Sequence, residues 1–297
     1  MVSSSLRHQS IRFSQIATYV ALGLWSIICI LPVYWLALTS IKSAADLDQA
    51  PSYLPFIDFI PNLEAWRFIL LDPGESLLPR FLNSLIISST SAIVTLVMAV
   101  CSVYGMTRFK TSHIALSRYR TPIFFAVIAL RLVPPVLVAL PIYMIGTEFK
   151  IIDTHGLLIV IYSAFNFPLA LLLVIPVLSL RVTVEEESAR LDGAGHFVIL
   201  TNILVPMNRV QLMTIGVLMF ILCWNEYLLA TYLTYDHAET LTPWMIGQLS
   251  MKEAQTGGGS EEISHMAAAA IFMAIPAFLL TYSLQRLVKD LVGRSLT

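Results

Sequence analysis

The sequence predicts an all-α membrane protein in which six transmembrane helices form a single domain over residues 1–297. Of its residues, 57% are hydrophobic and only 12% are charged, and the mean hydropathy is +0.77. These values lie far outside those of soluble globular domains. The apolar residues also form runs long enough to cross a hydrocarbon core of about 30 Å. Because lipid satisfies no backbone groups, runs of this length predict helices.

Six apolar runs separated by polar segments are the predicted spans. They cover residues 16–40, 82–107, 121–146, 157–180, 209–234 and 265–287. The first run follows Arg7 and Arg12, like the apolar run of a signal peptide. It is longer than a signal-peptide run, however, and Tyr34 and Trp35 close it in place of a small-residue cleavage site. We therefore expect the first run to be retained as a helix.

The basic residues of the connections predict the orientation. If both termini lie inside, the inner segments carry Arg7, Arg12, Arg108, Lys110, Arg118, Arg120, Arg181, Arg190, Arg209, Arg286, Lys289 and Arg294. The outer segments then carry only Lys42, Arg67, Arg80, Lys150 and Lys252. Basic residues concentrate in cytoplasmic connections. Both termini are therefore predicted to be cytoplasmic.

Several function classes are disfavoured by composition and motifs. The formal net charge of −1 argues against a nucleic-acid partner, which would require a basic face. The sequence has no phosphate-binding GxxxxGK[ST] loop, no GxSxG nucleophile elbow and no HExxH helix. Its histidines are scattered singly, so no metal site is predicted, and its three cysteines lie in apolar spans without disulfide spacing. If the protein uses ATP, another chain must bind it.

The stretch 184–206 is an unusually polar cluster in the second half of the chain. It reads VEEESARLDGAGHFVILTNILVP. Helix formers dominate 185–191, Gly193 permits a turn, and Pro206 permits a bend before the fifth span. The sequence therefore predicts a short helix, a turn and a second helix on the inner face of the membrane.

The spacing within this stretch resembles a known family. From Glu187 to Pro206, the chain reads Glu-Ser-Ala, three residues, Gly193, nine residues and Ile-Leu-Val-Pro. This pattern resembles the EAA signature of permease subunits of bacterial ATP-binding-cassette (ABC) importers, with Ser188 and Val205 in place of the usual Ala and Leu. The wider EEESARLDGAG is similar to the signature of MalG-like permeases, which belong to carbohydrate importers of the maltose class.

The resemblance covers most of the chain, from about residue 16 to residue 291. Three further segments resemble MalG-like permeases: PIYMIGTEFKIIDTHGLLIVIY (141–162), WNEYLLA (224–230) and the run at 267–291. The chain ends in LVGRSLT, which departs from the Gly-rich end common in the family.

The resemblance implies an importer subunit of the bacterial inner membrane that is not itself an enzyme. Its implied partners are a second, MalF-like permease, an ATPase dimer, an external solute-binding protein and membrane lipid. ATP and Mg would bind to the ATPase, and this chain would bind no cofactor. The stretch 184–206 would be a coupling helix that docks on the ATPase. The implied coupling residues are Glu186, Glu187, Ser188, Ala189, Asp192, Gly193 and Ala194.

A simpler interpretation of the three glutamates is a solvated run at a helix start, where the helix dipole favours carboxylates. The complete spacing to Gly193 and Pro206 favours the coupling loop instead. Glu185 and Glu186 are the two glutamates for which mere solvation stays open.

Arg131, Asn225 and Glu226 are polar residues inside predicted spans. Ionisable side chains are costly in lipid and usually face a pathway or a partner, so these residues are predicted to line the translocation pathway or a gate. Pro134, Pro135 and Pro141 predict a helix break beside it. Two alternatives stay open: Arg131 lies nearer the membrane surface, or Glu226 is a hydrogen-bonded structural residue.

Two long outer loops, 41–81 and 235–264, are rich in acidic residues and suit the docking of a solute-binding protein. The segment 250–262 contains three consecutive glycines and is predicted to be mobile. The residues predicted to contact the binding protein are Lys252, Glu253, Gln255, Gly257 and Gly258. The alternative is that this loop is only a tether between helices. Because the resembled family forms its sugar site largely on the other permease, no sugar contact is assigned to this chain.

Two other classes of membrane protein fit the sequence less well than an importer permease. A secondary transporter, driven by an ion gradient, predicts inverted repeats and a cluster of ionisable residues at the membrane midplane. No repeat is evident, and only Arg131 and Glu226 are available for such a cluster. An intramembrane enzyme would need a paired nucleophile, metal ligands or an acid–base pair, which the spans lack.

Overall fold

The computed structural model of the chain describes residues 2–49, 51–71, 77–108, 125, 127, 129–178, 184–247 and 260–295. The chain divides into two compact units. Unit 1 contains Met1–Ser76 and Leu249–Phe272, and unit 2 contains Leu77–Gln248 and Met273–Thr297. The single domain predicted over residues 1–297 stays a prediction.

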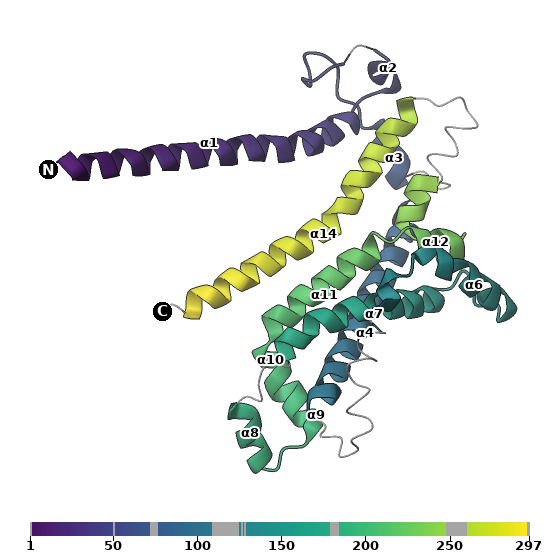
Figure 1. Cartoon of the computed structure of the whole chain (residues 1–297). Coiled ribbons are helices and arrows are strands. Elements are labelled where there is room, and N and C mark those ends of the chain that lie inside the picture. The colour runs from purple at the N-terminus through teal and green to yellow at the C-terminus, as the bar shows by residue number, and fades with distance from the viewer. Residues whose placement is uncertain are drawn as a thin grey trace. The chain divides into compact units, whose positions relative to one another are not determined.

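Helices make up the regular structure of both units (Figure 1). Unit 1 contains α1 (Val2–Thr39), α2 (Ala44–Leu47), α3 (Glu64–Leu71) and the first part of α14 (Ser260–Ser295). Unit 2 contains α4 (Leu77–Arg108), η1 (Leu130–Leu132), α6 (Pro135–Glu148), α7 (His155–Leu178), α8 (Val184–Leu191), α9 (His196–Val198), the π-helix η2 (Ile199–Leu204), α10 (Val205–Met207), α11 (Arg209–Trp224), α12 (Leu228–Leu233), a helical stretch over 241–247 and the end of α14. Over the described residues, the predicted all-α fold class is confirmed.

Four of the described helices are long and apolar enough to cross a membrane. Their apolar parts are Thr18–Thr39, Leu77–Arg108, His155–Leu178 and Glu262–Lys289, at the first, second, fourth and sixth predicted spans. A bent pair, His196–Met207 with Arg209–Trp224, would add a fifth span. Much of the third predicted span, 121–146, lies outside the described residues. The chain is therefore a multi-pass membrane protein, and the count of six spans stays a prediction.

The fifth predicted span, 209–234, is wrong as a continuous helix. Helices α11 and α12 are separated by the non-helical residues 225–227. The break has a local cause, because Asn225 Nδ2 donates to the Ile221 carbonyl at 2.8 Å while the Glu226 carboxylate accepts bonds from the backbone of α12. Side chains that bond to nearby backbone groups compete with the helical ladder and favour helix ends.

In unit 1, the segment after α1 folds back onto the end of that helix. The Tyr34 hydroxyl donates to the Tyr53 carbonyl at 2.7 Å. The Lys42 ammonium group, which is buried, donates to the Ser52 carbonyl at 2.7 Å. By contrast, the apolar residues of α1 are mostly exposed before its last turn, where Leu38 is buried. A helix that is apolar on all sides is suited to contact lipid or another apolar helix.

Both predicted outer loops are more structured than the sequence suggested. The loop 41–81 contains α2 and α3, and α4 begins within it. Within the loop 235–264, residues 241–247 are helical and α14 begins at Ser260.

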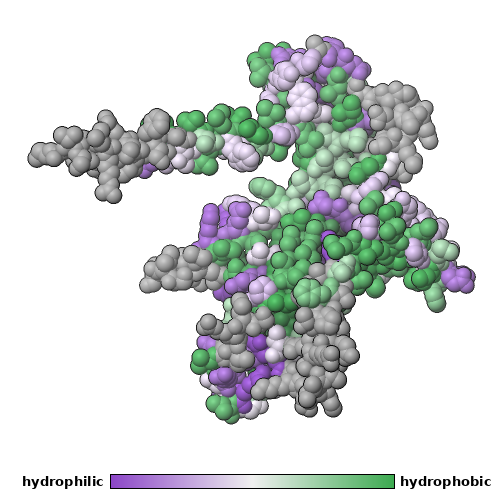
Figure 2. All heavy atoms as spheres, viewed as in Figure 1, coloured by the Kyte–Doolittle hydropathy of each residue, from purple (hydrophilic) through white to green (hydrophobic). Residues whose placement is uncertain are grey.

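The core of unit 2 forms where α4, α7 and α11 pack together. Small buried residues recur every three or four positions along α4, at Ser84, Ser88, Ser91, Thr95 and Ala99. Such a stripe lets two helix backbones approach closely. Across this contact, the Ser163 hydroxyl of α7 donates to the Ser91 carbonyl at 3.3 Å. Figure 2 shows hydrophobic residues over the visible middle of unit 2, whereas hydrophilic residues gather near α8.

Candidate functional site

A helical projection at one end of unit 2, here called the knob, contains α8, α9, η2 and α10 (Figure 1). Helix α8 carries three glutamates in its first turn, where the helix dipole favours carboxylates. The predicted order of helix, turn and second helix is confirmed, although the second helix includes one turn of π-helix.

The turn of the knob depends on Gly193, whose φ is +83°. The Gly193 N–H donates to the Arg190 carbonyl at 3.1 Å, and the Ala194 N–H donates to the Ala189 carbonyl at 2.9 Å. These two bonds form a Schellman motif, in which glycine is favoured at the left-handed position. A Cβ at Gly193 would meet no atom of this chain within 4 Å. Glycine is therefore required within the chain by its backbone angle and not by crowding.

Glu186 is fully buried, with a relative exposure of 0%. Its carboxylate accepts bonds from Arg108 Nε of α4 at 2.9 and 3.2 Å, and from Arg190 Nη2 at 3.1 Å. The alternative that Glu186 is merely solvated is therefore wrong, because its partner Arg108, distant in sequence, lies beside it. Glu185 is exposed, as a solvated residue would be.

The other predicted coupling residues lie at or near the surface of the knob. Glu187, Ser188, Asp192 and Gly193 are exposed, and Ala189 and Ala194 are half-buried. Two apolar neighbours that the sequence reasoning missed are also exposed, Leu191 by 89% and Phe197 by 78%. Their signal was the presence of large apolar residues inside a polar stretch. Exposed apolar and acidic side chains together make a surface suited to a protein partner.

A bend of 85° joins the knob to α11. It is centred on Asn208, whose side-chain amide donates to the Leu204 carbonyl at 2.8 Å. The bend that Pro206 was predicted to permit is confirmed, two residues further along the chain.

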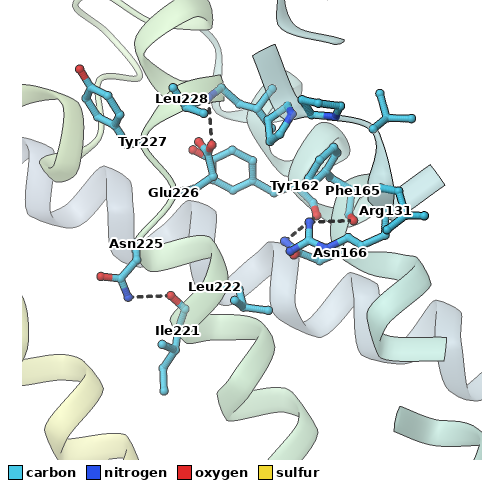
Figure 3. A pocket seen from close by; sticks show the side chains of 15 residues that line it. Arg131, Tyr162, Phe165, Asn166, Ile221, Leu222, Asn225, Glu226, Tyr227 and Leu228 are labelled. Carbon is cyan, nitrogen blue, oxygen red and sulfur yellow. Dashed lines mark hydrogen bonds between the residues drawn. The ribbon is translucent and has the colours of Figure 1, made fainter. Parts of the chain in front are cut away.

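A cavity of about 650 Å³ lies within unit 2, between η1, α7 and the break after α11 (Figure 3). Its polar and aromatic lining includes Arg131, Tyr162, Phe165, Asn166, Asn225 and Glu226. The structure thus brings the three predicted pathway residues together on one cavity, and Pro134 and Pro135 line it as well. The helix break predicted at Pro141 is wrong, because that residue lies inside α6. The sequence reasoning missed the three lining residues of α7, for which a polar Asn166 in an apolar span was the one available signal. The transport role of the lining stays a prediction.

Arg131 contacts α7 through its guanidinium group, which lies 4.8 Å from the centre of the Phe165 ring. Its Nη1 also donates to the Phe165 carbonyl at 3.5 Å. A cation over an aromatic face is stabilised without a carboxylate partner. This contact gives the half-buried Arg131 a defined position on the cavity wall.

Glu226 caps the helix that follows the break. Its two carboxylate oxygens accept the N–H groups of Leu229 at 2.9 Å and Ala230 at 3.0 Å. Both N–H groups lie in the first turn of α12, where no intrahelical acceptor exists. The hydrogen-bonded structural role that the sequence left open is therefore present in the structure. It does not exclude a role in the pathway, because the same side chain lines the cavity.

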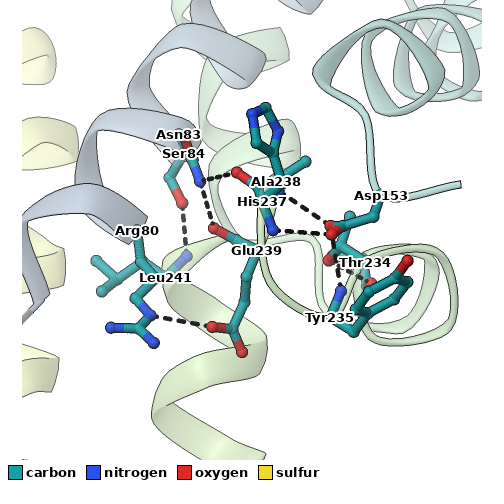
Figure 4. Close-up of polar contacts among 11 residues, drawn as sticks. Arg80, Asn83, Ser84, Asp153, Thr234, Tyr235, His237, Ala238, Glu239 and Leu241 are labelled. Atoms are coloured by element: carbon teal, nitrogen blue, oxygen red, sulfur yellow. Dashed lines mark hydrogen bonds and ion pairs between the residues drawn. The ribbon is translucent and has the colours of Figure 1, made fainter. Parts of the chain in front are cut away.

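A second polar cluster ties together the connections at the ends of α4, α7 and α12 (Figure 4). The Asp153 carboxylate accepts the backbone N–H groups of His237 at 2.8 Å, Ala238 at 3.0 Å and Tyr235 at 3.3 Å. In the same cluster, Asn83 Nδ2 of α4 donates to the carbonyl of His237 at 3.0 Å. This cluster, which the sequence reasoning did not identify, fixes the start of the predicted outer loop 235–264.

The environment shifts the pKa of two carboxyl groups in this cluster. Partial burial raises the pKa of Asp153, but its backbone hydrogen bonds outweigh burial and leave the pKa below the ordinary value of 3.8. Burial raises the pKa of Glu239 above the ordinary value of 4.5, although its ion pair with Arg80 at 3.0 Å opposes the rise. Some acidic residues of the two predicted outer loops are engaged by groups of their own chain: Glu239 pairs with Arg80, and Asp58 accepts the backbone N–H groups of Tyr53 and Leu54.

The predicted binding-protein contacts Lys252, Glu253, Gln255, Gly257 and Gly258 lie outside the described residues. Their role stays a prediction, as does the predicted mobility of this loop.

Comparison with known proteins identifies related sequences. A family described as "Binding-protein-dependent transport system inner membrane component" matches residues 115–294. The melibiose/raffinose/stachyose import permease protein MelC of Bacillus subtilis is 27% identical over 258 residues, which cover 86% of this chain and 87% of MelC. The trehalose/maltose transport system permease protein MalG of Thermococcus litoralis is 26% identical over 273 residues, which cover 89% of this chain and 90% of that protein.

Solved structures show the same fold. A chain of a bacterial ABC transporter involved in the import of the acidic polysaccharide alginate has a TM-score of 0.71 and 20% identity. The match covers 93% of this chain and 97% of that chain. A chain of the alginate transporter in complex with an alginate pentasaccharide-bound periplasmic protein has a TM-score of 0.61 and 13% identity.

Proposed function

Because the chain belongs to the family of binding-protein-dependent transport system inner membrane components, we propose that it is a permease subunit of an ATP-driven carbohydrate importer. The solute class rests on the relatives, whose names specify melibiose, raffinose, stachyose, trehalose and maltose. The cargo proposed for this chain is a sugar or a related polyol.

The observation that carries the proposal is the knob. Its turn is set by the backbone of Gly193, so the angle between its two helical parts does not depend on a partner. Its exposed residues include two carboxylates, Glu187 and Asp192, and two large apolar side chains, Leu191 and Phe197. Apolar side chains can fill a cleft on an ATPase subunit while the carboxylates pair with basic groups at its rim. ATP and Mg would be bound by that ATPase and not by this chain.

The cavity beside the broken span supplies a pathway for the solute. Polar amides and aromatic rings line it, and these groups suit a hydroxyl-rich solute that must be held weakly and released. The break at residues 225–227 places non-helical backbone beside a cavity, which is where such backbone is tolerated within a membrane. Closing and opening of the ATPase dimer would shift the knob and, through it, the helices around the cavity.

The remaining partners follow from the same arrangement. The exposed apolar surface of α1 suits lipid and a second, MalF-like permease. An external solute-binding protein would deliver the cargo to the outer loops. In a bacterial inner membrane with both termini on the cytoplasmic side, the knob would also lie on that side, where the ATPase binds.

Reconstitution of the four components in liposomes tests the proposal. The complex with the second permease, the ATPase dimer and the binding protein should take up a labelled sugar only when ATP is supplied on the side of the membrane that the ATPase faces, which is the liposome interior. An ATPase variant that lacks its phosphate-binding lysine is the control and should show no uptake. Uptake that follows an imposed ion gradient without ATP would instead identify a secondary transporter.

A further inference from the structure

The last two turns of α4 hold both halves of the knob. Tyr104 and Arg108 are four residues apart on α4 and therefore lie on the same face of the helix. Arg108 bonds to Glu186 in α8, before the turn of the knob. Tyr104 bonds to His196 in α9, after the turn. One face of one helix thus contacts the knob on both sides of Gly193.

The Arg108–Glu186 contact is the stronger of the two. The side chains are exposed by only 3% and 0%, and the guanidinium Nε lies 2.9 and 3.2 Å from the two carboxylate oxygens. Arg190, whose side chain is 39% exposed, adds a third charge at 3.1 Å. Charge-assisted bonds are short and directional, and a buried carboxylate that loses its partner is costly. Relative movement of α4 and α8 would therefore separate Arg108 from the carboxylate and leave Glu186 with Arg190 alone.

The Tyr104–His196 contact restrains the second half of the knob. The hydroxyl lies 3.0 Å from His196 Nδ1, and the two rings meet edge to face at a centroid distance of 5.9 Å. Tyr104 is itself buried. The contact thus combines a hydrogen bond with ring packing.

Helix α4 also reaches the walls of the cavity. It packs against α7, which supplies Tyr162, Phe165 and Asn166, and against α11, whose end supplies Ile221 and Leu222. The contact with α11 is close, because a Cβ at Gly216 would meet Leu96 of α4 at 3.4 Å. A displacement of α4 would therefore move the walls of the cavity on two sides.

We propose that Tyr104, Arg108, Glu186 and His196 form a clamp that makes the knob and α4 move as one body. Arg108 and Glu186 are then positioning residues that carry displacement from the knob to the cavity within this chain. Glu186 is consequently unavailable to an ATPase, and the exposed Glu187 and Asp192 are left for that contact. The inference rests on the proposed function.

The first test measures how many ATP molecules are hydrolysed per solute imported. Arg108→Ala leaves the buried Glu186 with Arg190 alone, and Glu186→Ala removes the carboxylate opposite the buried Arg108, so each single change should weaken assembly. The double variant Arg108→Ala/Glu186→Ala leaves no lone buried carboxylate and should assemble better than either single variant. Without the clamp, its ratio of ATP to solute should rise about tenfold, the scale of the interaction energy of two contacting residues.

Glu185→Gln is the matched control, since it also removes a glutamate charge from α8 but at an exposed position. It should show the wild-type ratio. An assembled double variant with the wild-type ratio would overturn the inference, as would an equal rise in the control. Failure of the proposed function is distinguishable, because then the wild-type complex itself would show no ATP-dependent uptake.

A second measurement does not depend on how the double variant folds. Cys101 on α4 is exposed, so it can carry one spin label, and Glu185→Cys on α8 can carry the other in a Cys29→Ser background. The clamp predicts the same label distance in the assembled complex with and without ATP. A change of more than about 3 Å, beyond the usual shift of a packed helix, would show that α8 moves independently of α4.

Discussion

Replacing Glu226 separates its role as a helix cap from a role of its charge in the pathway. In the wild type, its two oxygens accept the N–H groups of Leu229 and Ala230. A glutamine at this position keeps one acceptor oxygen, while its amide group cannot accept the second bond. A leucine accepts neither, so the first turn of α12 is left with two unpaired N–H groups beside the cavity.

The expected cost follows from these two bonds. Loss of one acceptor and of the charge near a helix N-terminus should destabilise the capped conformation by about 1 kcal/mol in Glu226→Gln. Loss of both acceptors in Glu226→Leu should cost about 2–3 kcal/mol. These energies correspond to roughly 5-fold and more than about 30-fold decreases in the population of capped α12. Uptake per assembled complex should therefore fall in the order wild type, Gln, Leu.

The assay is ATP-driven uptake in liposomes, normalised to the amount of assembled complex, together with thermal unfolding of the purified complex. Glu148→Gln, at the exposed end of α6, is the control for the loss of a glutamate charge and should behave as the wild type. Equal uptake by the wild type and both Glu226 variants would refute the reasoning. If Gln is as inactive as Leu although it unfolds almost like the wild type, transport requires the charge itself and not the cap.

Three further predictions concern the knob and the outer loops. Gly193→Ala should cost about 1 kcal/mol through the positive φ alone, whereas Gly193→Leu should also block the approach of an ATPase and abolish uptake; equal ATPase binding by the two variants would contradict this. Deletion of 256–260 should reduce uptake at limiting sugar without loss of the four-part complex, and unchanged uptake would make the loop a tether only. The lowered pKa of Asp153 predicts that its carboxylate contributes stability at neutral pH that is lost as the pH falls below about 3.8. Asp153→Asn should therefore unfold at a lower temperature than the wild type at pH 7, and the difference should shrink toward pH 3; a constant difference would contradict the assignment.

Some of the site could be predicted because its causes are local. The order of helix, turn and second helix between 184 and 206 follows from helix formers, a glycine that takes a positive φ and a proline near a bend. The residues Arg131 and Glu226 attracted attention because ionisable side chains are costly in lipid, wherever they lie in a fold. The break at 225–227 was missed, although its cause is also local, because apolar composition alone does not reveal a side chain that bonds to its own backbone.

The membrane class, the all-α fold and the form of the knob could be predicted from the sequence, because apolar runs, backbone propensities and the angle of Gly193 act over a few neighbouring residues. The packing of the helices, in contrast, buries Glu186 against Arg108, which lies 78 residues away. It also brings Asp153 to the backbone of the connection after α12 and places Arg131 on the same cavity as Glu226. The physical reason is that a charge or a hydrogen-bond acceptor has no partner in the sequence pattern: its role is set by which groups the packing of distant helices brings within about 3 Å.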